Sequence, residues 1–314
     1  MGPMIMNTTF PHYNGVSFTE VRGIGRSNEC FRRDNSNVVK ANGWYYVYYN
    51  RGPVWRDFLT GWHGSVWGAR SRDGHAWEEI GEMVPRGPDG RWDAWAVYCP
   101  NILVGRDGRY YLYFTGQPEC QKAGTPIYIG AASSASPEGP FERCGEAPVF
   151  SPTGKTEDFD GWRVDDASVI PRRGQYWMYY KGRGYGRATS QTQIGLAFSD
   201  TPVGPWKRSE NNPVIDVGHE IMAWPHAQGV AVYAWSHGSS ERENCAEVYY
   251  AGDGVNFEKS LTVTPAPRNP GGYFPDCYTD PPYGRGGTWG ISFVPANGKE
   301  YLTRFEMNLT AETE

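Results

Sequence analysis

Short stretches of aromatic and β-branched residues recur along the chain. They cover residues 44–50 (WYYVYYN), 109–116, 175–182, 229–236 and 288–294. Each stretch is bounded by clusters of Gly, Pro, Asn and Asp, a pattern that predicts β-strands. No window carries a sustained apolar stripe at i, i+3 and i+4, so the pattern does not predict amphipathic helices. In YYVYY both alternating faces are apolar, so both faces of its sheet must be covered.

A second signature follows most of these stretches: small residues along a strand, then a turn, then Trp or Phe. It occupies residues 67–77, 129–141, 194–206 and 248–257. Repeats of about 50–65 residues, each with about four strands, are typical of β-propellers. Five units fit the sequence, at about residues 31–86, 98–150, 165–215, 219–265 and 272–308.

We therefore predict an all-β fold with a single five-bladed β-propeller over residues 31–308. A β-sandwich is the alternative, but it does not require so long a period. The fifth unit shows only two clear strands, at 288–294 and 300–307. Residues 1–30 are an N-terminal segment, and its GVSFTEVRG (15–23) is predicted to supply the missing outer strand of the last blade or to make a dimer contact.

Composition narrows the function. The 314 residues carry a net charge of −5, whereas proteins that bind nucleic acid usually carry an excess of positive charge, so nucleic-acid binding is not predicted. No apolar run is long enough to cross a bilayer, and the first residues lack the features of a secretory signal. We expect a cytoplasmic protein, or a periplasmic one whose export signal lies outside this chain. The six cysteines show no CxxC pair, so no zinc site is predicted.

The sequence at the start of the first repeat occurs again at the start of the third. Residues 32–52 (RRDNSNVVKANGWYYVYYNRG) align without a gap on 163–183 (RVDDASVIPRRGQYWMYYKGR), placing Asp34 on Asp165. The first strand of a propeller blade lines the central channel, so both copies aim a carboxylate at one cavity. Asp166 is ranked second, because alternation along a strand should turn it into the blade. The structural alternative is that these aspartates only stabilise turns.

Other blade entries offer further polar groups. The second blade presents Cys99, Pro100 and Asn101, and the fourth presents His219 and Glu220. The fifth is expected to enter through YFPDCYTDPP, with Asp276 and Asp280. Hydrolysis of a glycosidic bond needs one protonated and one ionised carboxyl group, and a third acid raises the pKa of the donor. Asp34, Asp165 and Glu220, from three blades, match that demand.

The chain is also 15% aromatic, which suits both a large β core and a surface that stacks on sugars. The candidate substrate-binding residues near the same entries are aromatic rings that could stack and polar groups that could bind hydroxyls: Trp95, Trp162, Trp224, Arg163, His63, His226, His237, Asn101 and Asp280. Each of these types is also common in structural roles.

Over residues 30–308 the sequence resembles the five-bladed propeller glycosidases of families 43 and 62, and more closely the family 117 α-1,3-(3,6-anhydro)-L-galactosidases. The matching pieces are RRDNSNVV, RVDDASVI…YWMYYKGR and VGHEIMAWPHAQG. "DN" stands where family 43 commonly has "DP", which favours family 117. Members of that family often carry a helical N-terminal arm that swaps between subunits, whereas about thirty residues precede the first blade here, so a homodimer stays an open expectation.

The resemblance implies agar degradation by an inverting exo-enzyme, which releases 3,6-anhydro-L-galactose from the non-reducing end of neoagaro-oligosaccharides. It implies that Asp34 is the catalytic base, that Asp165 or Asp166 is the second aspartate, and that Glu220 is the glutamate of the site. His219 matches an unusual general acid. Residues 219 and 220 diverge in an extended segment. We favour His219 as donor, with Glu220 bonding hydroxyls and sustaining the charged imidazole; the exchange of these roles is the alternative.

Two other functions stay open. One is another exo-glycosidase of the same clan, of the α-L-arabinofuranosidase or β-xylosidase type. The other is a catalytically inactive glycan-binding propeller, although binding alone would not require three acids. The expected partner is an oligosaccharide, with no nucleic acid and no membrane. No cofactor or catalytic metal is expected to be required, although a carboxylate-lined channel could hold a structural Ca²⁺ or another divalent ion through oxygen ligands.

Overall fold

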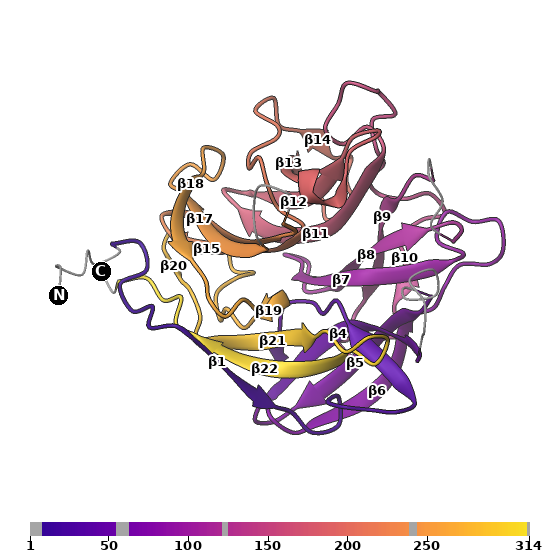
Figure 1. Cartoon of the computed structure of the whole chain (residues 1–314), viewed down its shortest axis with the longest axis horizontal. Helices are drawn as coiled ribbons and strands as arrows, with labels where there is room; N and C mark the ends of the chain where they lie inside the picture. The colour runs from indigo at the N-terminus through magenta and orange to yellow at the C-terminus, as the bar shows by residue number, and fades with distance from the viewer. Residues whose placement is uncertain (1–7, 55–62, 121–124, 239–243, 313–314) are drawn as a thin grey trace.

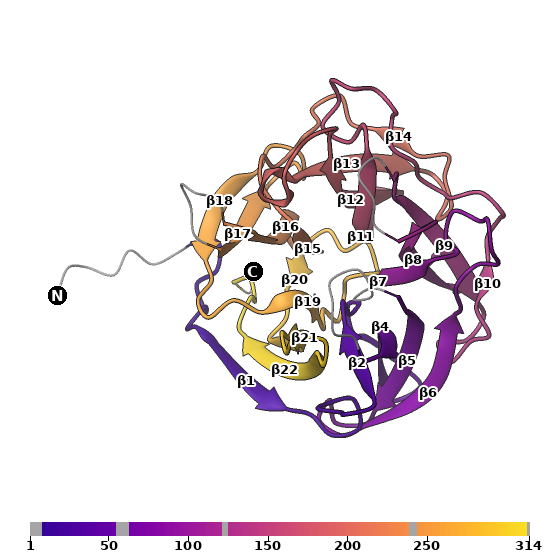
Figure 2. The same cartoon turned by 45° about the vertical axis from the view of Figure 1, so that its right-hand side comes forward.

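The fold of the chain, in a computed structural model, is a ring of five antiparallel sheets (Figures 1 and 2). The structure describes residues 8–54, 63–120, 125–238 and 244–312. The one helix in these ranges is the 3-10 turn η1 (Thr189–Gln191). The prediction of an all-β, five-bladed propeller is therefore confirmed. No helix in the described part of the chain is both long and apolar enough to cross a membrane.

The first four blades follow one another in chain order, and in each the first strand is innermost. From the second blade to the fifth, the inner strand of each blade contacts that of the next, as expected close to the axis. The strands of the first blade are β2 (Cys30–Arg33), β3 (Val39–Ala41), β4 (Trp44–Pro53), β5 (Ser65–Ser71) and β6 (Trp77–Val84). Those of the second are β7 (Ala96–Val104), β8 (Tyr110–Gln117), β9 (Tyr128–Ser134) and β10 (Glu142–Arg143).

The third and fourth blades repeat this meander. The strands of the third are β11 (Arg163–Arg172), β12 (Gln175–Arg183), β13 (Gln193–Ser199) and β14 (Lys207–Arg208). Those of the fourth are β15 (Glu220–Ala227), β16 (Gly229–Ser236), β17 (Cys245–Ala251) and β18 (Glu258–Thr262), and the short β20 (Gly284–Arg285) pairs with β15.

The fifth blade joins the two ends of the chain. It contains β19 (Arg268–Gly272), β21 (Trp289–Val294), β22 (Tyr301–Met307) and β1 (Val16–Glu20). β1 lies antiparallel to β22 at the outer edge (Figure 1). The N-terminal segment thus contributes a strand to the sheet that contains the last strand of the chain, and this closes the ring.

The entry of the fifth blade differs from the sequence expectation. Its inner strand is β19, whose sequence RNPGG lacks the aromatic and β-branched residues by which strands are recognised. Asp276 and Asp280 therefore lie in the loop between β19 and β21, and not at the entry of the blade.

The core lies between neighbouring blades. Tyr46 and Tyr48 of β4 pack in a cluster that includes second-blade residues such as Leu112. Val47 and Tyr49, on the other face of β4, pack with fifth-blade residues such as Ile291. Both faces of YYVYY are covered, as its sequence requires.

The inner strands of four blades contain an irregularity at one equivalent position. The pairing with the second strand shifts between Tyr98 and Asn101, between Asp165 and Ser168, and between Arg268 and Gly271. In the first blade Arg33 pairs with Asn50, and the Ser36 N–H then bonds to the Tyr48 carbonyl at 2.8 Å. Such bulges re-aim side chains and are frequent beside active sites.

The first residue of each bulge has a left-handed backbone: φ is 51° at Asp34, 46° at Cys99, 49° at Asp166 and 40° at Asn269. Asp34 is therefore the structural equivalent of Asp166, and the gapless alignment on Asp165 is one residue out of register here. The fourth blade has no such shift, since β15 pairs regularly with β16 from Glu220 onward.

Candidate active site

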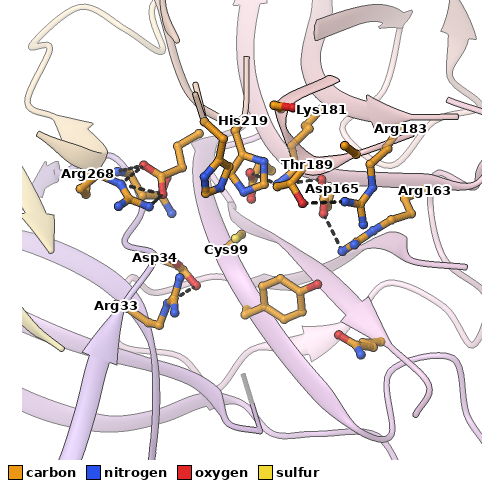
Figure 3. Close-up of a pocket in the computed structure, with 18 of the residues that line it drawn as sticks. Arg33, Asp34, Cys99, Arg163, Asp165, Lys181, Arg183, Thr189, His219 and Arg268 are labelled. Atoms are coloured by element: carbon orange, nitrogen blue, oxygen red, sulfur yellow. Dashed lines mark hydrogen bonds and ion pairs between the residues drawn. The ribbon is translucent and has the colours of Figure 1, made fainter. Parts of the chain in front are cut away.

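A cavity of about 440 Å³ lies where the inner strands of all five blades begin. Its lining contains nine charged side chains, and they are Arg33, Asp34, Arg163, Asp165, Asp166, Lys181, Arg183, Glu220 and Arg268. Figure 3 shows Arg33 and Asp34 on one side, Arg163, Arg183 and Thr189 grouped on another, and His219 and Cys99 between them. The five residues predicted to be catalytic, four acids and one histidine, all line this cavity.

Asp34 is buried on the first blade. Its Oδ2 accepts a hydrogen bond from Nε of Arg33 at 3.0 Å. Burial raises the pKa of Asp34, Arg33 opposes the rise, and the negative charge of Glu220 adds to it, with a net increase. A buried carboxylate with a raised pKa and one neighbouring cation is suited to accept a proton from water near neutral pH.

Two carboxylates of the third blade share one ammonium group. Nζ of Lys181 lies 3.2 Å from Oδ1 of Asp165 and 2.6 Å from Oδ2 of Asp166. Burial raises the pKa of Asp166 to about 7, with the charge of Asp165 contributing after the opposing effect of Lys181. The Asp165–Asp166 pair therefore holds one proton close to neutral pH.

The position of Asp166 corrects a sequence expectation. Alternation was expected to turn it into the blade, but it lines the cavity together with Asp165. The bulge is the reason, since the left-handed backbone at Asp166 breaks the regular alternation of side chains.

Glu220 is held as an ionised carboxylate. Arg268 donates to both of its oxygens, with Nε 3.0 Å from Oε2 and Nη2 2.6 Å from Oε1, and the Asn269 N–H donates to Oε2 at 2.7 Å. Burial alone would raise the pKa of Glu220, but these partners outweigh it and the pKa is lowered. The guanidinium also lies 3.7 Å from the ring centroid of Trp235.

His219 precedes β15, and its N–H donates to the Trp235 carbonyl at 2.6 Å. Burial lowers the pKa of His219 well below 6.5, and the charge of Lys181 lowers it further. The imidazole is therefore favoured in its neutral form, against the expectation of a charged imidazole beside Glu220. The ring of His237 lies 4.5 Å from that of His219, and its pKa is also lowered by burial.

Of the predicted sugar-binding residues, Arg163 lines the cavity, and so does His237. Trp162 lies under two guanidinium groups, with its ring centroid 5.4 Å from Cζ of Arg163 and 4.6 Å from Cζ of Arg183. Trp95 and His63 pack against each other with centroids 4.3 Å apart, and neither lines the cavity.

Four predicted binding residues have structural roles instead. Trp224 is fully buried and stacks on Phe274, and a ring nitrogen of His226 lies 2.7 Å from the Thr9 carbonyl. These two side chains lie four and six residues along β15 from Glu220, roughly 13 and 20 Å at the usual rise of a strand. Neither can reach a sugar in the cavity.

Asn101 and Asp280 are the other two. Oδ1 of Asn101 accepts the Val169 N–H at 3.0 Å, which ties the second blade to the third. Asp280 accepts the N–H groups of Arg173 and Gly174, at the far end of the β11–β12 hairpin from the cavity.

Several residues that line the cavity were not predicted from the sequence pattern, above all Lys181, Arg183 and Arg268. Lys181 and Arg183 pair in register with Asp165 and Arg163 across the β11–β12 hairpin. The tight turn that closes this hairpin at Arg173-Gly174 could have indicated that pairing to within one residue. Arg268 had no such signal, because β19 was not recognised as a strand.

Below the main cavity lies a much smaller one of about 10 Å³, whose lining includes Asn35, Asn37, Asn101 and Asp166. Oδ1 of Asn35 and Oδ1 of Asp166 are buried there without a partner among the described residues. In the whole described part of the chain, no group of three or more His, Cys, Asp or Glu residues is placed so that it could hold a metal ion. The donors are oxygens, the type that Ca²⁺ prefers, but they include a single carboxylate, where Ca²⁺ usually takes six to eight oxygen ligands. A channel ion stays a prediction.

Comparison with known proteins shows which families the sequence and the fold resemble. Residues 30–167 match glycosyl hydrolases family 43. The fold is similar to that of a family 117 glycoside hydrolase produced by the marine bacterium Zobellia galactanivorans, with 29% identity, a TM-score of 0.86, and coverage of 98% of this chain and 93% of that one. No curated protein matches the sequence.

More distant structures share the fold alone. An endo-arabinase from Bacteroides thetaiotaomicron VPI-5482 is 15% identical, with a TM-score of 0.62 over 92% of this chain and 97% of that one. A fructan 1-exohydrolase IIa from Cichorium intybus is 14% identical, with a TM-score of 0.63 over 91% of this chain and 58% of that one.

Proposed function

Because this chain is a glycoside hydrolase of the five-bladed propeller type, related to families 117 and 43, we propose that it is an inverting exo-enzyme. In this proposal it removes one terminal sugar from the non-reducing end of an oligosaccharide. Following the resemblance to family 117, 3,6-anhydro-L-galactose on a neoagaro-oligosaccharide is the first sugar to test.

One observation carries the proposal: acids from the first, third and fourth blades meet in one cavity. Asp34 and Asp166 occupy the same bulge position on two blades that are not adjacent, and Cys99 occupies it on the blade between them. Acids on separated blades leave room for a substrate and a water molecule, which inversion requires. A cavity of about 440 Å³ is in the range for a small ligand, and suits a chain end better than the middle of a polymer.

The environments of the acids suggest their roles. Asp34 acts as general base and removes a proton from the attacking water. The proton for the leaving oxygen comes from the Asp165–Asp166 pair, which retains it near neutral pH because burial raises the pKa of Asp166 to about 7. Glu220, fixed as a carboxylate by Arg268, accepts hydrogen bonds from sugar hydroxyls, and the neutral imidazole of His219 binds the sugar.

This assignment replaces His219, the donor favoured from the sequence, by the carboxyl pair. A histidine donates a proton as imidazolium, and burial beside Lys181 disfavours the imidazolium. A carboxyl group with a pKa near the working pH needs no such change.

The test is incubation with neoagarobiose and a panel of aryl furanosides and xylosides, followed by NMR of the first product formed. We expect 3,6-anhydro-L-galactose to be released with inverted anomeric configuration. A product with retained configuration would rule out the inverting scheme. Cleavage of arabinofuranosides or xylosides alone would favour the related exo-glycosidases, and binding without any cleavage would favour a glycan-binding propeller.

A further inference from the structure

The cavity wall formed by the third blade contains two arginines that face each other across a hairpin. Arg163 begins β11, Arg183 ends β12, and the two residues are directly paired in the antiparallel ladder. Each is less than a tenth exposed. Like charges in opposite positions of a ladder destabilise a sheet, and burial increases the cost.

The carboxylates of this wall do not balance its cations. Nη2 of Arg163 lies 3.3 Å from Oδ2 of Asp165, but Asp165 also binds Lys181. Arg183 has no carboxylate partner among the described residues, and its Nη1 donates to the neutral Oγ1 of Thr189 at 3.1 Å. Three cations thus face Asp165 and Asp166, which together keep one proton near neutral pH, so the wall carries an excess of positive charge.

The guanidinium groups also have unused donors. Nε of Arg163 and Nε of Arg183 are both buried without a hydrogen-bond partner among the described residues. Burial lowers the pKa of Arg183 to about 10, and the charge of Arg163 contributes to this decrease. Figure 3 shows both side chains beside Thr189 on one side of the cavity, and the hydroxyl groups of Thr189 and Ser190 belong to the same lining.

We propose that Arg163, Arg183 and Thr189 form an anion subsite, and that the substrate is an acidic oligosaccharide. The anionic group is a carboxylate or a sulfate ester on a sugar at or next to the bond that is cleaved. An anion in this place pairs with Arg183 and with the free face of Arg163, and it offsets the repulsion between them. Guanidinium groups are suited to this task, because their planar N–H pairs match carboxylate and sulfate oxygens.

The inference names the substrate class of the proposed hydrolase, and its test needs no turnover. Isothermal titration calorimetry at low ionic strength compares D-galacturonate, D-galactose 6-sulfate and neutral D-galactose. We expect at least one acidic sugar to bind about tenfold more tightly than galactose, the gain of one charge-assisted hydrogen bond. Preference for galacturonate, for the sulfate or for both identifies the chemical source of the anion.

Arg183→Gln removes the charge and keeps a hydrogen-bond donor. It should abolish most of the preference, measured as the ratio of the affinities for the acidic sugar and for galactose. Arg304→Gln is the matched control, because Arg304 is likewise less than a tenth exposed, lies with its Cζ 3.9 Å from the Trp289 ring centroid and does not line the cavity. Equal binding of acidic and neutral sugars, or an equal loss in both variants, overturns the subsite.

Inorganic sulfate gives a second readout if the monosaccharides bind too weakly to measure. At constant ionic strength against chloride, sulfate should raise the Tm of the wild type and of Arg304→Gln, but not that of Arg183→Gln. No rise, or the same rise in all three proteins, contradicts the subsite. Hydrolysis of neutral neoagarobiose at equal rates by wild type and Arg183→Gln, without any preference for anions, removes the subsite and keeps the hydrolase. A preference for anions without hydrolysis of any glycoside does the reverse.

Discussion

The first and third blades place an aspartate at the same bulge, in the same left-handed backbone, and give it different surroundings. Asp34 has Arg33 as its neighbour and ion-pair partner. Asp166 lies next to a second carboxylate, Asp165, and shares the ammonium group of Lys181 with it. The repeated backbone aims a carboxylate at the cavity in both blades, and the neighbouring residues then decide whether it holds a proton.

This difference fits a division of labour within an acid–base pair. Burial raises the pKa of both aspartates, and at Asp166 the negative charge of Asp165 raises it further, to about 7, against the opposing charge of Lys181. The third blade therefore keeps the proton, and the first blade is free to accept one. The fourth blade lacks the bulge and supplies Glu220, whose pKa is lowered by Arg268 and the Asn269 N–H against the effect of burial.

The largest expected effect comes from replacing each aspartate by asparagine. Asp34→Asn should lower kcat by roughly 10²–10⁴-fold, the usual contribution of a general base, on every substrate. Asp166→Asn should lose as much on the natural oligosaccharide, but less than about tenfold on a 2,4-dinitrophenyl glycoside, because that leaving group needs little protonation. The measurement is kcat for both variants on both substrates.

His219→Ala is the variant to compare with these two. If His219→Ala, and not Asp166→Asn, recovers activity on the dinitrophenyl glycoside, histidine is the donor and the comparison of the two blades loses its functional meaning. If Asp34→Asn is the variant that recovers, the base and the acid must be exchanged between the blades.

A smaller effect is expected on the pH dependence of stability. The pKa of Asp166 is about 7 in the folded protein and about 3.8 without the fold, so the folded state holds this proton more tightly. As pH rises from about 4 to 7, the unfolded chain loses the proton first and the free energy of unfolding falls, by about 1.4 kcal/mol for each pKa unit. Above pH 7 this contribution stays constant.

Asp166→Asn has no carboxyl group to titrate at this position. Urea titrations at pH 5 and pH 8 give the free energy of unfolding of both proteins. The value for the variant minus the value for the wild type should be larger at pH 8 than at pH 5. A difference that does not change with pH would mean that Asp166 is ionised over the whole range, like Glu220.

The fold was readable from the sequence because each blade repeats an aromatic strand and covers it on both faces. Tyr46, Val47, Tyr48 and Tyr49 show this directly, since alternate residues pack toward opposite neighbours. The exception is β19, where the ring geometry makes a strand of RNPGG against its local preference. A propensity reading could not find it, and so the entry of the fifth blade was placed in the following loop.

The site was only partly readable, for a related reason. The acids can be found because they stand at the heads of repeats. A bulge cannot be recognised from a pattern of alternating residues, and the orientation predicted for Asp166 is therefore wrong. Trp224 and His226 were chosen for their residue types, although their positions along β15 place them away from the cavity. Distance along the inner strand decides which side chains meet the substrate.

The smallest expected effect concerns the second blade, whose bulge carries Cys99 in place of an aspartate. Burial raises the pKa of Cys99 far above its usual value, so it is a neutral thiol, and it donates a weak hydrogen bond that favours the ionised form of Asp166.

Cys99→Ala removes that donor and should raise the pKa of Asp166, whereas Cys99→Ser supplies a stronger donor and should lower it. Because the proposed acid must be protonated, the alkaline limit of kcat, expected near pH 7 in the wild type, should move up in Cys99→Ala and down in Cys99→Ser. We expect both shifts to be below about one pH unit, with kcat at the optimum within about threefold, since S–H is a weak donor. Shifts in the same direction, or a limit that neither variant moves, would mean that Asp166 does not set the alkaline limb and that the third blade is not the source of the proton.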